Sequence, residues 1–233
     1  MIAALSDLHM GPGGSLDRFG HEESRFLDFL ARLEARYDPI VLLGDLYETH
    51  LGRRFGDFAG ELGRCRRLRP RIAERFEGPQ YLRIFGNHDH VLGRREHVSD
   101  RIRMEAGGVR LLFCHGHQFD ALIDRVPLVG QLSSWAAARL ERRGVRGALA
   151  FLDRIDDRLS GLSPDPDTCR YQRRAFEFLA REGADVLVMG HTHLPAVTRR
   201  DGKVYVNTGA CFDGRLEYAH LDPERGDYEI RRG

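Results

Sequence analysis

Short apolar runs recur along the chain, and each of them ends in a cluster of polar residues. The runs are IAAL before Asp7, IVLL before Asp45, YLRIF before Asn87, VRLLF before His115 and DVLVM before His191. Short runs bounded by turn-forming residues are typical of strands that are buried on both faces. The pattern therefore predicts a largely parallel sheet whose loops carry the polar clusters.

Helical periodicity fills the intervals between several of these strands. Residues 21–36 and 169–181 place apolar side chains at helical spacing, and the alternation of strand and helix indicates an α/β fold. Near the C-terminus, AVTRR and KVYVN flank Asp201-Gly202, and LEYAHL and YEIRR flank a Pro-Glu-Arg-Gly turn. Both patterns predict antiparallel hairpins.

Residues from about 120 to 163 contain neither a polar cluster nor the alternation of a strand. Their apolar positions predict two or three amphipathic helices, which we interpret as a helical cap inserted into a single domain that spans residues 1–233. The turn-forming segment Pro164–Asp167 is expected to close this insertion.

The composition adds a few limits on the class of protein and on the cellular compartment in which we expect it. The 233 residues are 42% hydrophobic and 30% charged, and no run is long enough to cross a bilayer, so a soluble protein is expected. The net charge of +1 argues against long-range attraction of nucleic acid. Four cysteines without a CxxC pair favour a reducing, cytoplasmic setting. The first strand begins at the N-terminus and leaves no room for a signal peptide.

The polar clusters lie where the loops of an α/β sheet converge, beyond the carboxyl ends of the strands. Any one cluster is common by chance, but their order and the strand before each one favour a metal site. The candidate ligands are Asp7, His9, Asp45, Asn87, His115, His191 and His193. Oxygen and imidazole ligands suit Mn²⁺ or Fe²⁺, with Zn²⁺ and Co²⁺ as alternatives.

The order D-x-H, G-D, G-N-H-D, H and G-H-x-H resembles the pattern of the calcineurin-like metallophosphoesterase superfamily, from Asp7 to Gly209. The resemblance implies an α/β fold in which a two-sheet β-sandwich is flanked by helices. It also implies two divalent metal ions bridged by Asp45. The first ion would be held by Asp7, His9, Asp45 and His193, and the second by Asp45, Asn87, His115 and His191.

The same resemblance implies roles for residues beside the ligands. His88 matches a histidine of the family that is not a ligand and acts as a general acid or as a cation that stabilises the transition state. Asp89 and Glu48 are expected either to orient metal-binding histidines by accepting their free ring N–H or to be plain surface residues. His50 and His117 lie near the rim, where each could contact a substrate phosphate, but both are interpreted as solvated loop histidines.

Two divalent cations bring four positive charges, whereas the proposed ligands include only two carboxylates. The surplus attracts phosphate oxygens and lowers the pKa of a bound water. We therefore expect a hydrolase of phosphate monoesters or diesters that uses metal-bound hydroxide. Its partner would be a phosphorylated small molecule or a nucleotide-linked lipid. The alternatives are a nuclease, which is not favoured, and a binding scaffold, against which the complete ligand set argues.

Within the superfamily, the helical insertion and the segment GDLYETHLG resemble the UDP-2,3-diacylglucosamine hydrolases of lipid A synthesis. For this chain, peripheral association with the inner face of a membrane is therefore an alternative to a purely cytoplasmic location. Those enzymes normally have arginine where this chain has His88. The apolar face of the insertion is expected either to pack on the core or to line a groove, with arginines near a diphosphate. The residues concerned are Leu122, Ile123, Val126, Leu128, Val129, Leu132 and Trp135, with Arg139, Arg142 and Arg143.

Overall fold

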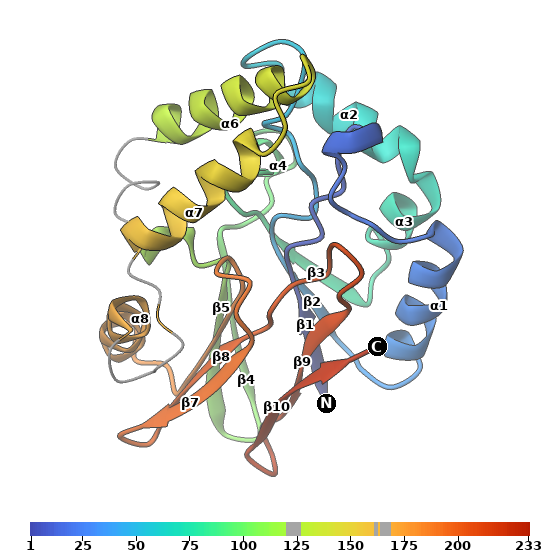
Figure 1. Ribbon diagram of the computed structural model, residues 1–233. Coiled ribbons are helices and arrows are strands. Elements are labelled where there is room, and N and C mark those ends of the chain that lie inside the picture. Colours follow the sequence, from blue (N-terminus) through green and yellow to red (C-terminus); the bar gives the residue numbers. More distant parts are fainter. Residues whose placement is uncertain (120–126, 161–162, 164–168) are drawn as a thin grey trace.

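The computed structural model describes residues 1–119, 127–160, 163 and 169–233, and it contains two five-stranded mixed sheets that pack against each other (Figure 1). The first sheet has the order β10-β9-β1-β2-β3, in which β1, β2 and β3 are parallel and β9 is antiparallel to both of its neighbours, β1 and β10. Its strands are β1 (Ile2–Leu5), β2 (Ile40–Leu43), β3 (Tyr81–Ile84), β9 (Glu217–Asp222) and β10 (Asp227–Arg232).

The second sheet has the order β4-β5-β6-β8-β7. Strands β5, β6 and β8 are parallel, and antiparallel strands close both edges. Its strands are β4 (Arg101–Ala106), β5 (Val109–Cys114), β6 (Val186–Met189), β7 (Ala196–Arg200) and β8 (Lys203–Asn207). The expected α/β fold with two sheets is confirmed, as are both hairpins at the C-terminal end.

Successive residues of the central strands are buried on opposite faces. In β1, Ile2 and Ala4 face the second sheet, where Phe113 and Val188 belong to the same apolar cluster. Ala3 and Leu5 instead join the cluster beneath the outer helices. This double burial explains why the strands read as short, uninterrupted apolar runs.

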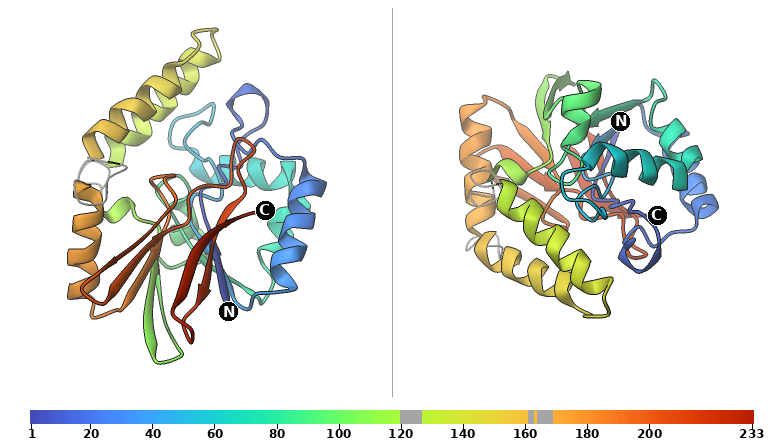
Figure 2. Two further views of the ribbon diagram at one scale, coloured as in Figure 1. Left: turned by 60° about the horizontal axis from the view of Figure 1, so that its bottom comes forward. Right: turned by 90° about the horizontal axis from the view of Figure 1, so that it is seen from above.

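Helices cover the outer face of each sheet (Figures 1 and 2). Helices α1 to α3 lie beside the first sheet, and α8 packs on the second, so that the molecule is layered as helix, sheet, sheet and helix. The helices are α1 (Glu23–Glu34), α2 (Phe58–Leu68), α3 (Pro70–Arg75), α4 (Val91–Glu96) and α8 (Arg170–Arg181), with short 3₁₀ turns η1 (Gly14–Leu16) and η2 (His117–Phe119).

Two antiparallel helices, α6 (Pro127–Glu141) and α7 (Ala148–Ser160), lie above the carboxyl ends of the strands, within the segment for which the sequence predicts a helical cap (Figure 2). We refer to this pair of helices as the cap. Arg142, just after α6, donates hydrogen bonds to the carbonyl groups of Leu51 and Gly52 and so fastens the cap to the loop after β2. Leu122, Ile123, Val126 and the predicted closing segment Pro164–Asp167 lie outside the described residues.

Gly44 allows the loops after β2 and β3 to touch. Its φ is +88°, and a Cβ atom there would overlap the backbone of Gly86. We expect Gly44→Ala to lower the free energy of unfolding by about 3 kcal/mol, from the left-handed conformation and the overlap together. Gly56→Ala is the control, because its φ is +83° with nothing within 4 Å, and it should cost about 1 kcal/mol. Urea denaturation measures both values, and equal losses would contradict the close-contact explanation.

Candidate metal centre

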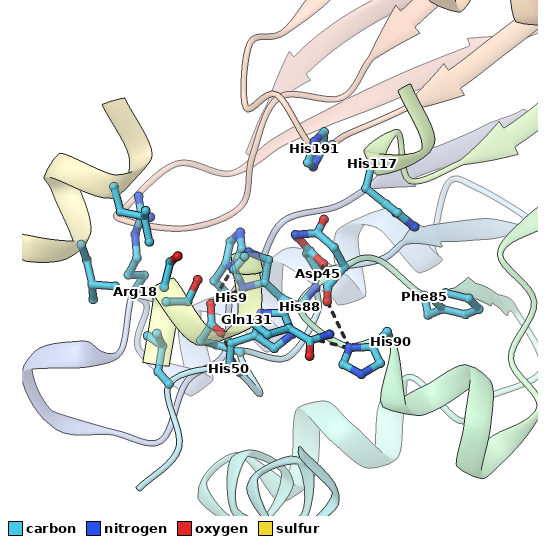
Figure 3. A pocket seen from close by; sticks show the side chains of 18 of the residues that line it. His9, Arg18, Asp45, His50, Phe85, His88, His90, His117, Gln131 and His191 are labelled. Carbon is cyan, nitrogen blue, oxygen red and sulfur yellow. Dashed lines mark hydrogen bonds and ion pairs between the residues drawn. The ribbon is translucent and has the colours of Figure 1, made fainter. Parts of the chain in front are cut away.

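The seven predicted ligands meet at one rim of the sandwich, beneath the cap. Loops after β1, β2 and β3 carry the ligands of the first sheet, and loops after β5 and β6 carry those of the second. Figure 3 shows His9, Asp45 and His191 facing one cavity with His88. The two sheets therefore contribute to a single site. The first sheet supplies Asp7, His9, Asp45 and Asn87, and the second supplies His115, His191 and His193.

Five of these seven residues have a left-handed backbone. Their φ values lie between +45° and +70°, and they account for five of the eight such non-glycine residues in the described chain. This conformation costs about 1–3 kcal/mol per residue and persists where the surrounding structure enforces it, typically at functional sites. The residues are Asp7, His9, Asp45, His191 and His193.

The ligand atoms of Asp7, His9 and His193 lie within 4.8 Å of one another. His9 Nε2 is 3.4 Å from His193 Nε2, which in turn is 3.2 Å from Asp7 Oδ1. Asp7 Oδ2 accepts hydrogen bonds from the Ser6 hydroxyl and from the backbone N–H of His191, whereas Oδ1 is buried without a hydrogen bond. An open carboxylate oxygen beside two imidazole nitrogen atoms fits a divalent cation.

A second group consists of Asp45, His115 and His191, again with ligand atoms within 4.8 Å of one another. His115 Nδ1 donates to the carbonyl group of Leu43 at 2.7 Å, which directs Nε2 toward Asp45 Oδ2 and Asn87 Oδ1, each 3.1 Å away. A backbone acceptor of this kind fixes the ring of a metal-binding histidine. Burial lowers the pKa of His115, but the carboxylates of Asp45 and Asp7 and the carbonyl group of Leu43 together outweigh burial and raise it to about 9.

Glu48 connects the first group to His88. Its Oε2 atom lies 2.8 Å from His88 Nδ1 and 3.3 Å from His9 Nδ1. Burial raises the pKa of Glu48, but the contacts with His88 and His9 together outweigh burial and lower it, which favours the ionised carboxylate. Glu48 thus contacts two histidines of the site from behind.

Asp89 has a different environment. Its carboxylate accepts hydrogen bonds from the backbone N–H groups of Gly86 at 2.7 Å and Leu46 at 2.8 Å. Burial, together with the charge of Asp45, raises the pKa of Asp89 to about 6. Asp89 therefore connects the two loops that carry Asp45 and Asn87. One expectation from the sequence was that its carboxylate accepts the ring N–H of a histidine, but its hydrogen bonds come from backbone N–H groups.

The interpretation of His50 as a solvated loop residue is wrong, and His117 lies partly buried in the 3₁₀ turn η2. His50 is only 6% exposed and stacks near His88 and His90, with ring centroids 4.9 Å and 5.5 Å away. Burial lowers the pKa of His50 to about 3 and that of His117 to about 4, with neighbouring histidines adding to the shift. Burial thus favours the neutral form of both rings, and both line the cavity.

The cavity has a volume of about 790 Å³ and extends from the ligands to the underside of the cap. Helix α6 contributes Val129 and Gln131, and α7 contributes Leu149, Leu152 and Ile155. The apolar side chains of this part of the wall come mainly from α7, which the sequence did not indicate, whereas Leu128, Leu132 and Trp135 of α6 do not line the described cavity wall. Arg139, Arg142 and Arg143 are absent from the described cavity wall, so the arginines expected near a diphosphate are not the ones that line it.

Comparison with known proteins identifies the family. A family model described as calcineurin-like phosphoesterase matches residues 1–195, which include all seven candidate ligands. The chain belongs to this family.

The chain is also similar to individual proteins, one from a comparison of sequences and two from a comparison of structures. It is 27% identical to the UDP-2,3-diacylglucosamine hydrolase of Chromobacterium violaceum, over 95% of this chain and 94% of the relative. Among solved structures, an archaeal phosphodiesterase is 14% identical, with a TM-score of 0.49 over 100% of this chain and 99% of that one. Vacuolar Protein Sorting 29 from Cryptosporidium parvum is 13% identical, with a TM-score of 0.48 over 100% and 95%.

The calcineurin-like phosphoesterase cavity also has wall residues that the sequence did not indicate. Arg18 comes from the glycine-rich loop after β1, and Phe212 and Arg215 come from the loop before β9. None of them directly follows one of the short apolar runs after which the sequence analysis placed the candidate residues. The described helices include none that is long and apolar enough to cross a membrane.

Proposed function

We propose that the protein hydrolyses phosphate esters with two divalent metal ions held by the seven side chains at the strand ends. The observation that supports this most directly is Asp7 Oδ1, which is buried without a hydrogen bond beside two imidazole nitrogen atoms. That donor set is one that divalent transition-metal ions prefer. Membership of the calcineurin-like phosphoesterase family supports the class of reaction.

Asp45 is the residue best placed to be shared by both ions. Its carboxylate groups with His9 on one side and with His115 and His191 on the other. Burial raises the pKa of Asp45, but His115 and His88 outweigh burial and lower it, which keeps the carboxylate in the ionised form that a ligand needs. Bound divalent ions would polarise the phosphoryl group and supply hydroxide near neutral pH.

His88 is proposed as the general acid. Glu48 Oε2 lies 2.8 Å from its Nδ1 atom and would hold the ring in place while the imidazole donates a proton to the leaving oxygen. The side chain is 24% exposed and lines the cavity, where a substrate can reach it. Glu48 is proposed to position both His88 and His9.

We propose Mn²⁺ as the physiological ion, with Fe²⁺, Zn²⁺ and Co²⁺ as alternatives, because the ligands combine carboxylate, amide and imidazole without thiolate. The four cysteines are buried and unpaired, which supports a reducing cytoplasmic setting. Exposed apolar side chains on the cap, such as Leu128 and Phe151, support peripheral contact with the inner face of a membrane.

The second candidate function is a pyrophosphatase that acts on an acylated nucleotide sugar. The apolar cavity wall formed by Val129, Leu149, Leu152 and Ile155 favours it, as does the similarity to the UDP-2,3-diacylglucosamine hydrolase. The presence of His88 in place of arginine favours the broader phosphoesterase. We therefore place the general reaction first.

The general reaction is tested with p-nitrophenyl phosphate and bis(p-nitrophenyl) phosphate. Chelator-treated protein is expected to hydrolyse neither ester, and Mn²⁺ should restore activity as two ions per chain are bound, measured by elemental analysis. If Mn²⁺-treated protein remains inactive on both esters and binds no ion, the proposed function is wrong.

The second candidate is tested by comparing UDP-2,3-diacylglucosamine with UDP-glucose. If the apolar wall binds acyl chains, kcat/KM for the acylated substrate should be at least about a hundredfold higher, since each buried CH₂ group contributes about 0.8 kcal/mol. Equal turnover of both compounds would remove the pyrophosphatase while leaving the general reaction intact.

A further inference from the structure

Two arginines share one aromatic ring in the wall of the cavity. The guanidinium carbons of Arg18 and Arg215 lie 4.3 Å and 4.5 Å from the ring centroid of Phe212, which is 2% exposed. Stacking of this kind holds a guanidinium group in a defined plane while its edge N–H groups stay available. The ring of Phe212 therefore holds together two guanidinium groups that come from distant parts of the sequence.

Backbone hydrogen bonds build this arrangement. The backbone N–H of Arg215 donates to the carbonyl group of Phe212 at 3.0 Å, and Asp213 and Gly214 between them have φ values of +49° and +83°. The resulting tight turn brings Phe212 and Arg215 together. The backbone N–H of Asp213 donates to the carbonyl group of Arg18 at 2.9 Å, which fixes the second loop to this turn.

The pair lies directly beside the candidate metal centre. The ring centroid of Phe212 is 4.9 Å from that of His193 and 5.3 Å from that of His9. Arg215 also donates a hydrogen bond to the carbonyl group of His193 at 3.2 Å. In the view of Figure 3, Arg18 lies at the end of the cavity away from Phe85, with His9 and Asp45 between them.

The charge of this wall is incompletely neutralised. Arg18 Nε lies 3.6 Å from Asp213, whose side chain is 57% exposed. Among the described residues, Arg215 has no carboxylate within 4 Å, and its side chain donates a hydrogen bond to the neutral carbonyl group of His193. Arginine is well suited to such a position because its fork of N–H donors matches the oxygen atoms of a phosphate group.

We propose that Arg18 and Arg215 form a second anion subsite, which binds a phosphate group adjoining the one that is cleaved and so selects diphosphates over monophosphates. The inference rests on the proposed function and deepens it by naming a substrate class. It also reassigns the recognition of a diphosphate from the cap arginines, which do not line the described cavity wall, to Arg18 and Arg215.

Competition between two nucleotides tests the subsite. ADP and AMP share every group except the second phosphate, and each is titrated as an inhibitor of bis(p-nitrophenyl) phosphate hydrolysis at a fixed excess of Mn²⁺. The wild-type protein should bind ADP at least about tenfold more tightly than AMP, as expected for charge-assisted hydrogen bonds in a partly solvated site. In the double variant Arg18→Gln/Arg215→Gln, the ratio of the inhibition constant of AMP to that of ADP should fall close to one.

A matched control separates this effect from a general loss of positive charge. Arg199 also stacks on an aromatic ring, that of Tyr228 at 5.4 Å, but it does not line the described cavity wall. Arg199→Gln should keep the wild-type ratio. Circular dichroism spectra check that all variants are folded.

Two results would overturn the subsite: a wild-type ratio near one, or a ratio that the double variant leaves unchanged. Loss of the preference for ADP in the double variant, with the preference retained in Arg199→Gln, would support it. A failure of the proposed function is distinguishable, because the wild-type protein would then hydrolyse no ester. In that case calorimetric titration of the same two nucleotides into Mn²⁺-treated protein measures the ratio directly.

Discussion

Asp45→Asn is expected to abolish metal binding and to lower phosphoesterase activity by about a thousandfold or more. The substitution removes a negative charge from the carboxylate that groups with ligands on both sides, and a neutral amide cannot hold two divalent ions. The fold should survive, because asparagine tolerates the left-handed backbone that Asp45 adopts at φ +51°. Elemental analysis and kcat/KM for bis(p-nitrophenyl) phosphate measure the two losses.

Asp201→Asn is the matched control for this variant. Asp201 has the same residue type and a similar φ of +50°, but it lies exposed in the turn between β7 and β8. It should retain full activity and metal content. An Asp45→Asn protein that still bound two ions and turned over the ester would show that Asp45 is not the bridging ligand.

His88→Ala is expected to lower kcat by about a hundredfold to ten-thousandfold while leaving the metal content unchanged, which is the range for loss of a general acid. The loss should depend on the leaving group. An alkyl phosphate needs a proton on its leaving oxygen, whereas p-nitrophenolate leaves readily without one. We therefore expect a large loss for the alkyl ester and a much smaller one for the p-nitrophenyl ester.

The pattern of losses decides between the roles of His88. An equal loss for both esters would indicate stabilisation of transition-state charge, and loss of bound metal would indicate a structural role. His97→Asn provides the comparison, because His97 is an exposed histidine at the end of α4 with a φ of +56° that asparagine tolerates. It should leave both activities unchanged.

The strands that carry the ligands could be predicted because burial on both faces leaves them no polar positions. Strand β4 was not predicted, since it is a half-exposed edge strand in which arginine and glutamate interrupt the apolar residues. Helices α2 and α3 were also missed. Arginines and glycines leave α2 with few apolar positions. Pro70 begins α3, so that only Arg69 lies between the two helices.

The candidate site was predictable to the extent that its residues directly follow those strands. The positions of His50 and Arg18 depend on how loops distant in the sequence pack together, and no local pattern records such packing. His50 is enclosed by Phe58 and His90, and Arg18 is placed by a turn almost two hundred residues away. The left-handed backbone of the ligands is equally invisible, since aspartate and histidine adopt ordinary conformations elsewhere.

The division of the ligands between the two sheets has a consequence for folding. The first sheet contributes Asp7, His9, Asp45 and Asn87, and the second contributes His115, His191 and His193, so a cation bound by residues of both sheets would cross-link the two halves of the sandwich. Its binding energy would then oppose their separation as well as serve the reaction. Occupancy of the metal site and the cooperativity of unfolding would be thermodynamically linked. Loss of the ions would loosen the sandwich at the rim where the substrate is proposed to bind.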